Sequence, residues 1–264
     1  MNEFLISVLN GLTVASLYFI AASGFALVFG FLRVVNMAHG AMFLLGGYIG
    51  YSAANATGSW VLGVLAAFAG VALLAALLQL LILRRAREDI FREALMTIGI
   101  ATILADLMLS GWGGQTYQLE APAWLDGAVQ LPFIGRYSML RLAAMVLALG
   151  VGLSMWWALS STRLGSLIRA GVDDQEMLGA LGFNVRRMQT LVFACGAGIV
   201  AASGVIGATV LSISPGEDAR YLLTSLIVVI VGGMGTIAGT ALGALLVGLA
   251  EQLGLTYSPT YAAT

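Results

Sequence analysis

Few side chains in this 264-residue sequence have the type and spacing that chemistry requires. The single histidine, His39, and the single cysteine, Cys195, fall short of a zinc ligand set. All 12 basic residues are arginine, so the lysine of a phosphate-binding P-loop is missing. No arrangement of serine, histidine and acid stands out for nucleophilic catalysis. We therefore expect no catalytic residue, no metal and no cofactor in this chain.

Polar residues beside apolar segments are the remaining candidates, because polar groups at membrane depth are costly and often functional. Asp106 and Glu251 are the carboxylates nearest to apolar helix interiors. A pair of them would suit an ion-coupled transporter, although we favour a snorkelling or packing role for each. Asn36 and His39 stand beside Gly40 and either face a solute pathway or satisfy freed backbone groups at a helix start. We favour the second role.

A third candidate is the connection over residues 161–187, whose second half has the pattern of a short helix. Asp173 would cap its free backbone N–H groups, Glu176 would complete a capping box, and Gly182 would end it. Its apolar face consists of Met177, Leu178 and Leu181. Such a helix either docks into a groove on another protein or lies flat on the bilayer surface.

The composition places these candidates in a membrane. Hydrophobic side chains make up 60% of the sequence and charged ones 9%, against about 25% charged in globular domains. A span needs roughly 20 apolar residues, and several long segments contain no charge at all. The net charge of -1 gives no reason to expect a nucleic acid partner. We expect a single all-α polytopic membrane domain over residues 1–264 with the lipid bilayer around it.

The charge-free segments predict about eight membrane-spanning helices and leave open that some of them are broken. The run from Val34 to Leu83 is too long for one span, and the turn-forming residues 55–59 divide it. The expected spans are 5–30, 38–54, 60–83, 94–112, 138–160, 188–211, 219–236 and 238–255.

Arginine placement predicts the orientation, because short loops rich in basic residues stay on the cytoplasmic side. With the N-terminus outside, nine arginines are cytoplasmic and three, Arg136, Arg141 and Arg220, are not. The loop over 113–136, which is rich in aromatic residues and proline, is then on the outer side, and that over 161–187 is cytoplasmic.

Gly232, Gly233 and Gly235 interrupt a charge-free run of residues 221–250. The interruption fits a broken helix, whose exposed backbone dipoles hold polar solutes in transporters. It equally fits a tight turn between two ordinary spans.

Three stretches resemble the permease subunits of ABC importers of the branched-chain amino acid type. The first, Asn36-Met37-Ala38-His39-Gly40, is similar to the family's Asn-x-Ala-His-Gly signature. The second contains Arg163, Gly165, Arg169 and the segment Leu181-Gly182-Phe183-Asn184, and resembles the family's cytoplasmic coupling segment. The third is the glycine-rich end of the sequence, with Gly232, Gly233, Gly235 and Glu251. The sequence departs from the family at its end, where members usually continue through a further apolar helix.

The resemblance implies an ATP-driven importer for branched-chain or other hydrophobic amino acids in the bacterial inner membrane. Its partners would be a second permease subunit, homologous or identical, two cytoplasmic ATPase subunits that bind ATP and magnesium, and an extracytoplasmic solute-binding protein. The segment 161–187 would couple the ATPase to the bundle. Relatives also carry urea or short amides, which remains an alternative. An ion-coupled secondary transporter or channel and a structural anchoring subunit are the others.

Overall fold

The computed structural model describes residues 2–85, 89–131 and 135–257. Some residues used in the sequence analysis lie outside these ranges. They are Arg87, one of the nine arginines predicted to be cytoplasmic, Pro132 in the loop over 113–136, and the last seven residues. The elements are α1 (Asn2–Leu32), α2 (His39–Thr57), α3 (Trp60–Leu81), a 3₁₀ turn η1 (Leu83–Arg85), α4 (Ile90–Trp112), β1 (Ala128–Leu131), β2 (Gly135–Ser138), α5 (Met139–Ser161), α6 (Arg163–Asp173), α7 (Gln175–Ala180), α8 (Val185–Val210), α9 (Asp218–Gly232) and α10 (Ile237–Tyr257).

The all-α polytopic class is confirmed, and a helix lies at each of the eight expected spans. Within the described residues, six helices are long and apolar enough to cross a membrane: α1, α3, α4, α5, α8 and α10. Helices α2 and α9 do not meet these criteria. The sequence reasoning missed one small feature, the antiparallel pair of β1 and β2 in the outer loop, with Val129 opposite Tyr137.

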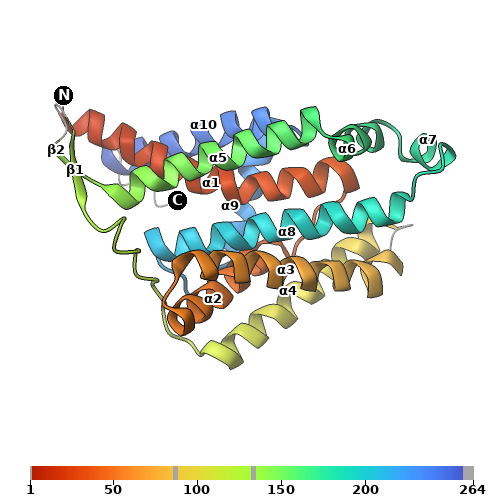
Figure 1. Cartoon of the computed structure of the whole chain (residues 1–264), viewed down its shortest axis with the longest axis horizontal. Helices are drawn as coiled ribbons and strands as arrows, with labels where there is room; N and C mark the ends of the chain where they lie inside the picture. The colour runs from red at the N-terminus through yellow and green to blue at the C-terminus, as the bar shows by residue number, and fades with distance from the viewer. Residues whose placement is uncertain (1, 86–88, 132–134, 258–264) are drawn as a thin grey trace.

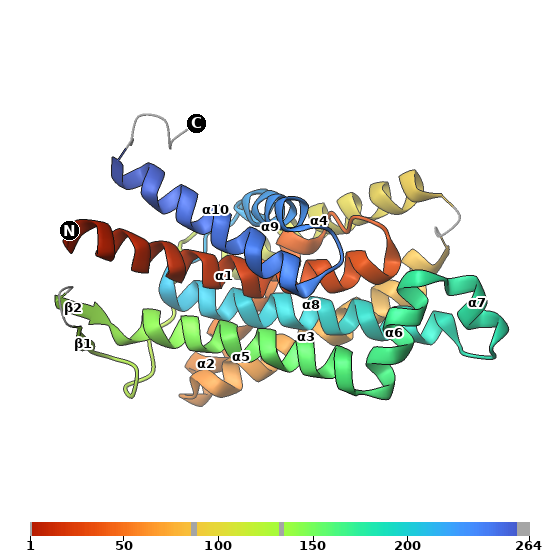
Figure 2. The same cartoon turned by 90° about the horizontal axis from the view of Figure 1, so that it is seen from above.

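The long helices run side by side along the molecule (Figure 1). The hairpin of β1 and β2 and the start of α1 lie at one end, and α6 and α7 lie at the other. Figure 2 shows α9 nearly end-on, so this helix crosses the others instead of running parallel to them. Its 15 residues extend about 22 Å, less than the roughly 30 Å of the hydrocarbon core. A span along 219–236 was therefore the wrong interpretation.

The core of the molecule is formed by α1, α2 and α8. Both α1 and α8 are mostly buried, whereas α3, α4, α5 and α10 bury only about a fifth of the residues in their most apolar segments. Helix α2 packs on α3, α4, α8 and α9, which shield it from lipid, so it does not need an apolar surface all round. A Cβ atom at Gly204 would overlap the backbone oxygen of Phe43, so glycine allows α8 to approach α2 this closely.

Local sequence signals explain where several of these helices begin and end. Helix α2 ends at the expected turn, where Gly58 is its C-cap, and Ser59 then caps α3. The carboxylate of Asp89 accepts a hydrogen bond of 2.9 Å from the backbone N–H of Phe91 and so caps α4. These caps fix the length of each helix and the end of the molecule at which each connection lies.

Candidate functional site

The connection over 161–187 forms two short helices, α6 and α7, where the sequence indicated one. The hydroxyl oxygen of Thr162 accepts a hydrogen bond of 3.0 Å from the backbone N–H of Gly165 and caps α6. A Cβ atom at Gly165 would overlap the backbone oxygen of Leu159, so glycine permits this tight turn from α5 into α6. Arg163 and Arg169 are exposed on α6.

The expected cap of the second helix is wrong by one residue. Asp173 is the last residue of α6, and the carboxylate of Asp174 caps α7 by accepting 2.9 Å bonds from the N–H groups of Glu176 and Met177. Asp174 has an extended backbone, which ends one helix and starts the next. Gly182 adopts a φ of 86° just after α7, as its predicted position at the helix end requires.

The expected apolar face of α7 is also partly wrong, because its members point in different directions. Leu178 is 2% exposed and belongs to a small core with Phe31 of α1 and Met188 of α8. Met177 and Leu181 are 58% and 68% exposed. Helix α7 is thus held to the bundle by one leucine and presents two other apolar side chains outward.

Polar contacts tie the same region to the end of α1. The amide nitrogen of Gln175 donates to the backbone oxygen of Phe31, and its amide oxygen accepts a 2.8 Å bond from Gln189 of α8. The guanidinium of Arg33 donates a 2.6 Å bond to the backbone oxygen of Val172. These bonds connect α6 and α7 directly to the end of α1 and to the segment that follows it.

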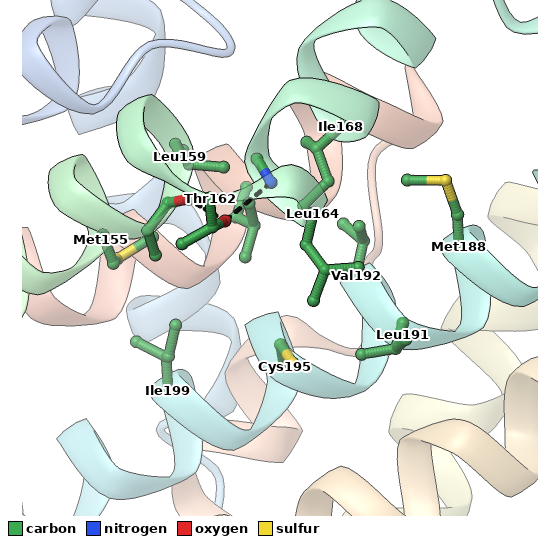
Figure 3. Close-up of a pocket in the computed structure, with 13 residues that line it drawn as sticks. Met155, Leu159, Thr162, Leu164, Ile168, Met188, Leu191, Val192, Cys195 and Ile199 are labelled. Carbon is green, nitrogen blue, oxygen red and sulfur yellow. Dashed lines mark hydrogen bonds between the residues drawn. The ribbon is translucent and has the colours of Figure 1, made fainter. Parts of the chain in front are cut away.

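An apolar cavity of about 320 Å³ lies between α5, α6 and α8, directly beside this region. Figure 3 shows Met155 and Leu159 of α5, Ile168 of α6, and Cys195 and Ile199 of α8 around it. The cavity therefore separates part of α6 from α8, and among the described residues α6 packs chiefly against α5, α7 and α1. This arrangement leaves room for α6 to shift without opening the core.

The signature residues at the start of α2, Asn36, His39 and Gly40, are buried inside the protein. The side-chain oxygen of Asn36 accepts a 3.0 Å bond from the backbone N–H of Ala38, which fits the structural role that we favoured. His39 is 3% exposed, and its ring stands edge-on to Phe25 with the centroids 5.0 Å apart. A Cβ atom at Gly40 would overlap the backbone oxygen at the start of α9, so the two helix starts meet here.

The late glycines form a turn between α9, which is shorter than a span, and α10, so the structure has the turn of one alternative without its two ordinary spans. Helix α9 ends at Gly232 and α10 begins at Ile237, with φ angles of 97° at Gly233 and 89° at Gly235 in between. A Cβ atom at Gly232 would overlap the backbone oxygen of Gly239. The glycines thus allow α9 to cross α10 with backbone against backbone.

The two carboxylates that could have formed a coupling pair are on helices with different neighbours. The phenol of Tyr18 donates a 2.6 Å bond to Glu251, so Glu251 packs between α10 and α1. Asp106 is exposed on α4, which packs chiefly on α2. The two carboxylates therefore do not form a pair, which agrees with a packing or snorkelling role for each.

Comparison with known proteins identifies the family of this helical bundle. A model of the branched-chain amino acid transport system permease component matches residues 7–263, nearly the whole chain. The chain belongs to this permease family. No solved structure matches it.

Curated relatives of the permease agree with the family model. The chain is 26% identical to the high-affinity branched-chain amino acid transport system permease protein LivH of Salmonella typhimurium, over 97% of this chain and 88% of the relative. It is 27% identical to BraD of Pseudomonas aeruginosa, over 96% and 86%. It is also 27% identical to LivH of Escherichia coli K12, over 97% and 88%.

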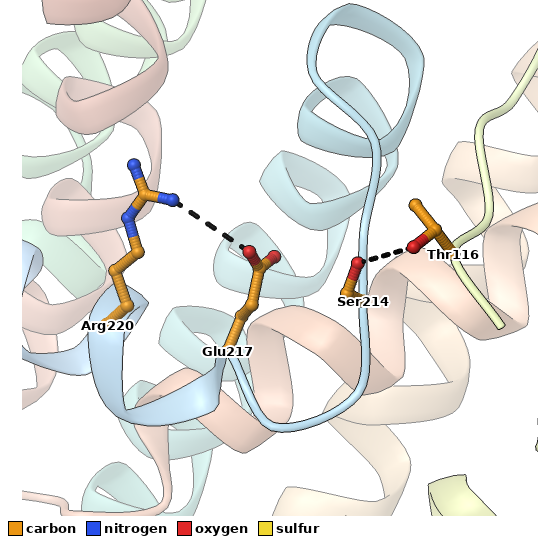
Figure 4. A network of polar contacts seen from close by, with 4 residues as sticks. All are labelled: Thr116, Ser214, Glu217 and Arg220. Carbon is orange, nitrogen blue, oxygen red and sulfur yellow. Dashed lines mark hydrogen bonds and ion pairs between the residues drawn. The ribbon is translucent and has the colours of Figure 1, made fainter. Parts of the chain in front are cut away.

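Polar contacts hold the loops of the permease together at the end opposite α7. The hydroxyl groups of Thr116 and Ser214 are 2.9 Å apart, and Arg220 lies 3.8 Å from the carboxylate of Glu217 (Figure 4). Tyr117 and Ile213 form a β-bridge between the same two segments. The long connection between α4 and α5 is thus attached to the segment that leads into α9.

Sequence reasoning missed Gln175 and Gln189, which connect α7 to α1 and α8 in this permease. Their role depends on the end of α1, since Phe31 is 144 residues away from Gln175 in the sequence, and an isolated glutamine carries no local signal of it. Gln189 is 5% exposed. A polar residue at this depth in α8 was the one available indication.

Proposed function

We propose that this permease component forms half of the pathway of an ATP-driven importer for branched-chain or other hydrophobic amino acids. The relatives carry the name of branched-chain amino acid systems, which supports this solute class. A homologous or identical permease chain would supply the other half. An extracytoplasmic binding protein would deliver the solute, and the chain would reside in the bacterial inner membrane.

The observation that carries the proposal is the arrangement of α7. Met177 and Leu181 are exposed together at one end of the molecule, while Leu178 holds the same helix to α1 and α8. An exposed apolar pair on a well-capped helix fits a groove on a protein partner. We assign this surface to one of two cytoplasmic ATPase subunits, which would bind ATP and magnesium themselves.

Coupling would proceed through contacts of this chain. A motion of the ATPase would displace α7, and the buried Leu178 and the amide of Gln175 would pass the displacement to the end of α1. The cavity beside α6 provides the space for such a shift. Purification from native membranes tests the proposal, because an ATPase must accompany this chain if α7 docks it.

An ion-coupled carrier is the rival function and is less well supported. Such a carrier needs a titratable pair near the pathway, and Asp106 and Glu251 lie on helices with different neighbours. It also has no use for α7. Solute uptake by the purified chain alone, driven by an ion gradient in liposomes, would favour the carrier over the importer.

The proposed orientation predicts the pattern of labelling by a thiol reagent that does not cross membranes. In a chain without Cys195, a cysteine at the exposed Ala128 should react in intact spheroplasts, and one at the exposed Glu176 should not. Both should react after permeabilisation, which is the control for accessibility. The reverse pattern would place α7 outside and remove it from the reach of any cytoplasmic ATPase.

Gln175→Ala is expected to separate docking from transport. The change removes the bonds to Phe31 and Gln189 but leaves Met177 and Leu181 in place. The ATPase should still co-purify, and uptake should fall roughly 30-fold, since two hydrogen bonds contribute about 1 kcal/mol each. Thr102→Ala, which removes an exposed hydroxyl that bonds to the backbone oxygen of Ile98 within α4, is the control. Unchanged uptake by the glutamine variant would show that the coupling runs elsewhere.

A further inference from the structure

A second cavity, of about 590 Å³, lies on the other side of α8, between α8 and the end of α3. Three arginines line it: Arg84 of η1, and Arg186 and Arg187 in the first turn of α8. No carboxylate lines this cavity, and none of the three guanidinium groups forms an ion pair with a residue that the structure describes. Among the residues that the structure describes, no acidic side chain neutralises this cationic cavity.

Away from the arginines the cavity wall is mostly apolar, with Asn184 and Thr190 as its other polar residues, and it extends along the two helices. Ala76 of α3 precedes Arg84 by eight residues, about 12 Å along a helix, and Ala194 of α8 follows Arg186 by the same number. Leu80 of α3 and Leu191 of α8 lie between the alanines and the arginines. The small side chains at the deep end leave the space open, so the cavity has a cationic end and an apolar end.

We infer that this cavity binds an anionic phospholipid of the cytoplasmic leaflet, with its phosphate on the arginines and an acyl chain between α3 and α8. The assignment rests on the orientation proposed above, in which the arginines lie at the cytoplasmic surface. Guanidinium groups bind phosphate in bidentate geometry, and basic pockets between membrane helices are suited to anionic headgroups.

The depth of the apolar wall favours a lipid over a segment of the ATPase. Ala76 and Ala194 belong to helices that are long and apolar enough to cross the membrane, well inside their ends. A soluble protein reaches the arginines at the surface but not this level of the bilayer, whereas an acyl chain occupies it naturally. The bound lipid would fill the gap beside the first turns of α8 and so steady the helix onto which Leu178 packs.

The test measures lipid binding to the purified chain in nanodiscs of phosphatidylcholine with added phosphatidylglycerol, read by native mass spectrometry. Arg186→Gln with Arg187→Gln should weaken phosphatidylglycerol binding roughly 30-fold, given the attraction of each arginine to an anionic membrane surface. Arg85→Gln with Arg92→Gln removes the same charge from exposed positions that do not line the cavity. This control should bind the lipid as the parent does.

A second variant tests the apolar half with all arginines retained. Ala194→Phe should fill the deep end and expel the lipid, while Val146→Phe, on the exposed surface of α5, should not. Because this pair leaves the charge unchanged, it decides the question even if the arginine variant misfolds.

Three outcomes would overturn the inference. Equal losses in the two arginine variants would mean that only surface charge attracts the lipid. Retained binding in Ala194→Phe would mean that no chain enters the cavity. Loss of a co-purifying ATPase with the lipid retained would assign the arginines to the protein interface. The first two outcomes require neither an ATPase nor a working importer, so a failure there is distinguishable from failure of the proposed function.

Discussion

Changing Met177 and Leu181 together to aspartate is expected to detach the ATPase from this permease and to abolish solute uptake. Both side chains are more than half exposed on α7, so the change should leave insertion and folding intact. In a docked complex each carboxylate would be buried without a partner, which costs on the order of a few kcal/mol. Two such charges weaken docking by factors of roughly 100 or more.

Two further variants separate docking from folding. Met177→Leu with Leu181→Met exchanges the two side chains, keeps the surface apolar, and should retain both the ATPase and uptake. Leu178→Asp places a charge at a position that is 2% exposed, so it should lower the amount of folded protein instead. The amount in the membrane, the ATPase pulled down with the chain and the uptake rate are the three measurements.

Each result has a distinct meaning for the function. Uptake that persists without a bound ATPase would contradict the importer and favour a self-sufficient carrier. An ATPase that remains bound to the aspartate variant would place its docking surface elsewhere on the chain, outside α7. Loss of both ATPase and uptake, with the chain present at normal levels, is the result that the exposed pair predicts.

The long helices could be predicted from the sequence because their signals are local. The apolar segments were predictable from runs without charged residues. The turn between α2 and α3 was predictable from Gly58 and Ser59. The position of Gly182 after α7 was predictable for the same reason, since few other residues adopt a positive φ. Such signals determine where a helix starts and stops.

The direction of a helix and of its side chains could not be predicted in this way. The run over 221–250 gives the length of an apolar segment, but α9 turns across the bundle because Gly232 and Gly239 let it meet α10 backbone to backbone. Leu178 points inward because Phe31, far away in the sequence, lies beneath α7. Asp173 and Asp174 are chemically alike, and the end of α6 decides which of them caps α7.

The crossing of α9 over α10 yields the second large expected effect. Gly232→Leu should abolish uptake and sharply reduce the folded permease, because even a Cβ atom would overlap the backbone oxygen of Gly239. Helix backbones have no flexible end that can move aside, so the two helices must separate. Overpacking of a close contact costs typically 1–3 kcal/mol or more, a large part of the stability of a small protein.

Two further variants, Gly233→Leu and Gly150→Leu, allow the effect of leucine to be compared at three glycine positions. Gly233 has open space around it but a φ of 97°, so leucine there is strained by about 1–2 kcal/mol without any clash. Gly150 of α5 has open space and an ordinary helical backbone, so leucine should be tolerated. Folded yield and uptake should therefore fall in the order Gly150, Gly233, Gly232. Normal uptake by the Gly232 variant would mean that α9 and α10 are not in contact at this crossing, and the turn would then have no part in holding the pathway.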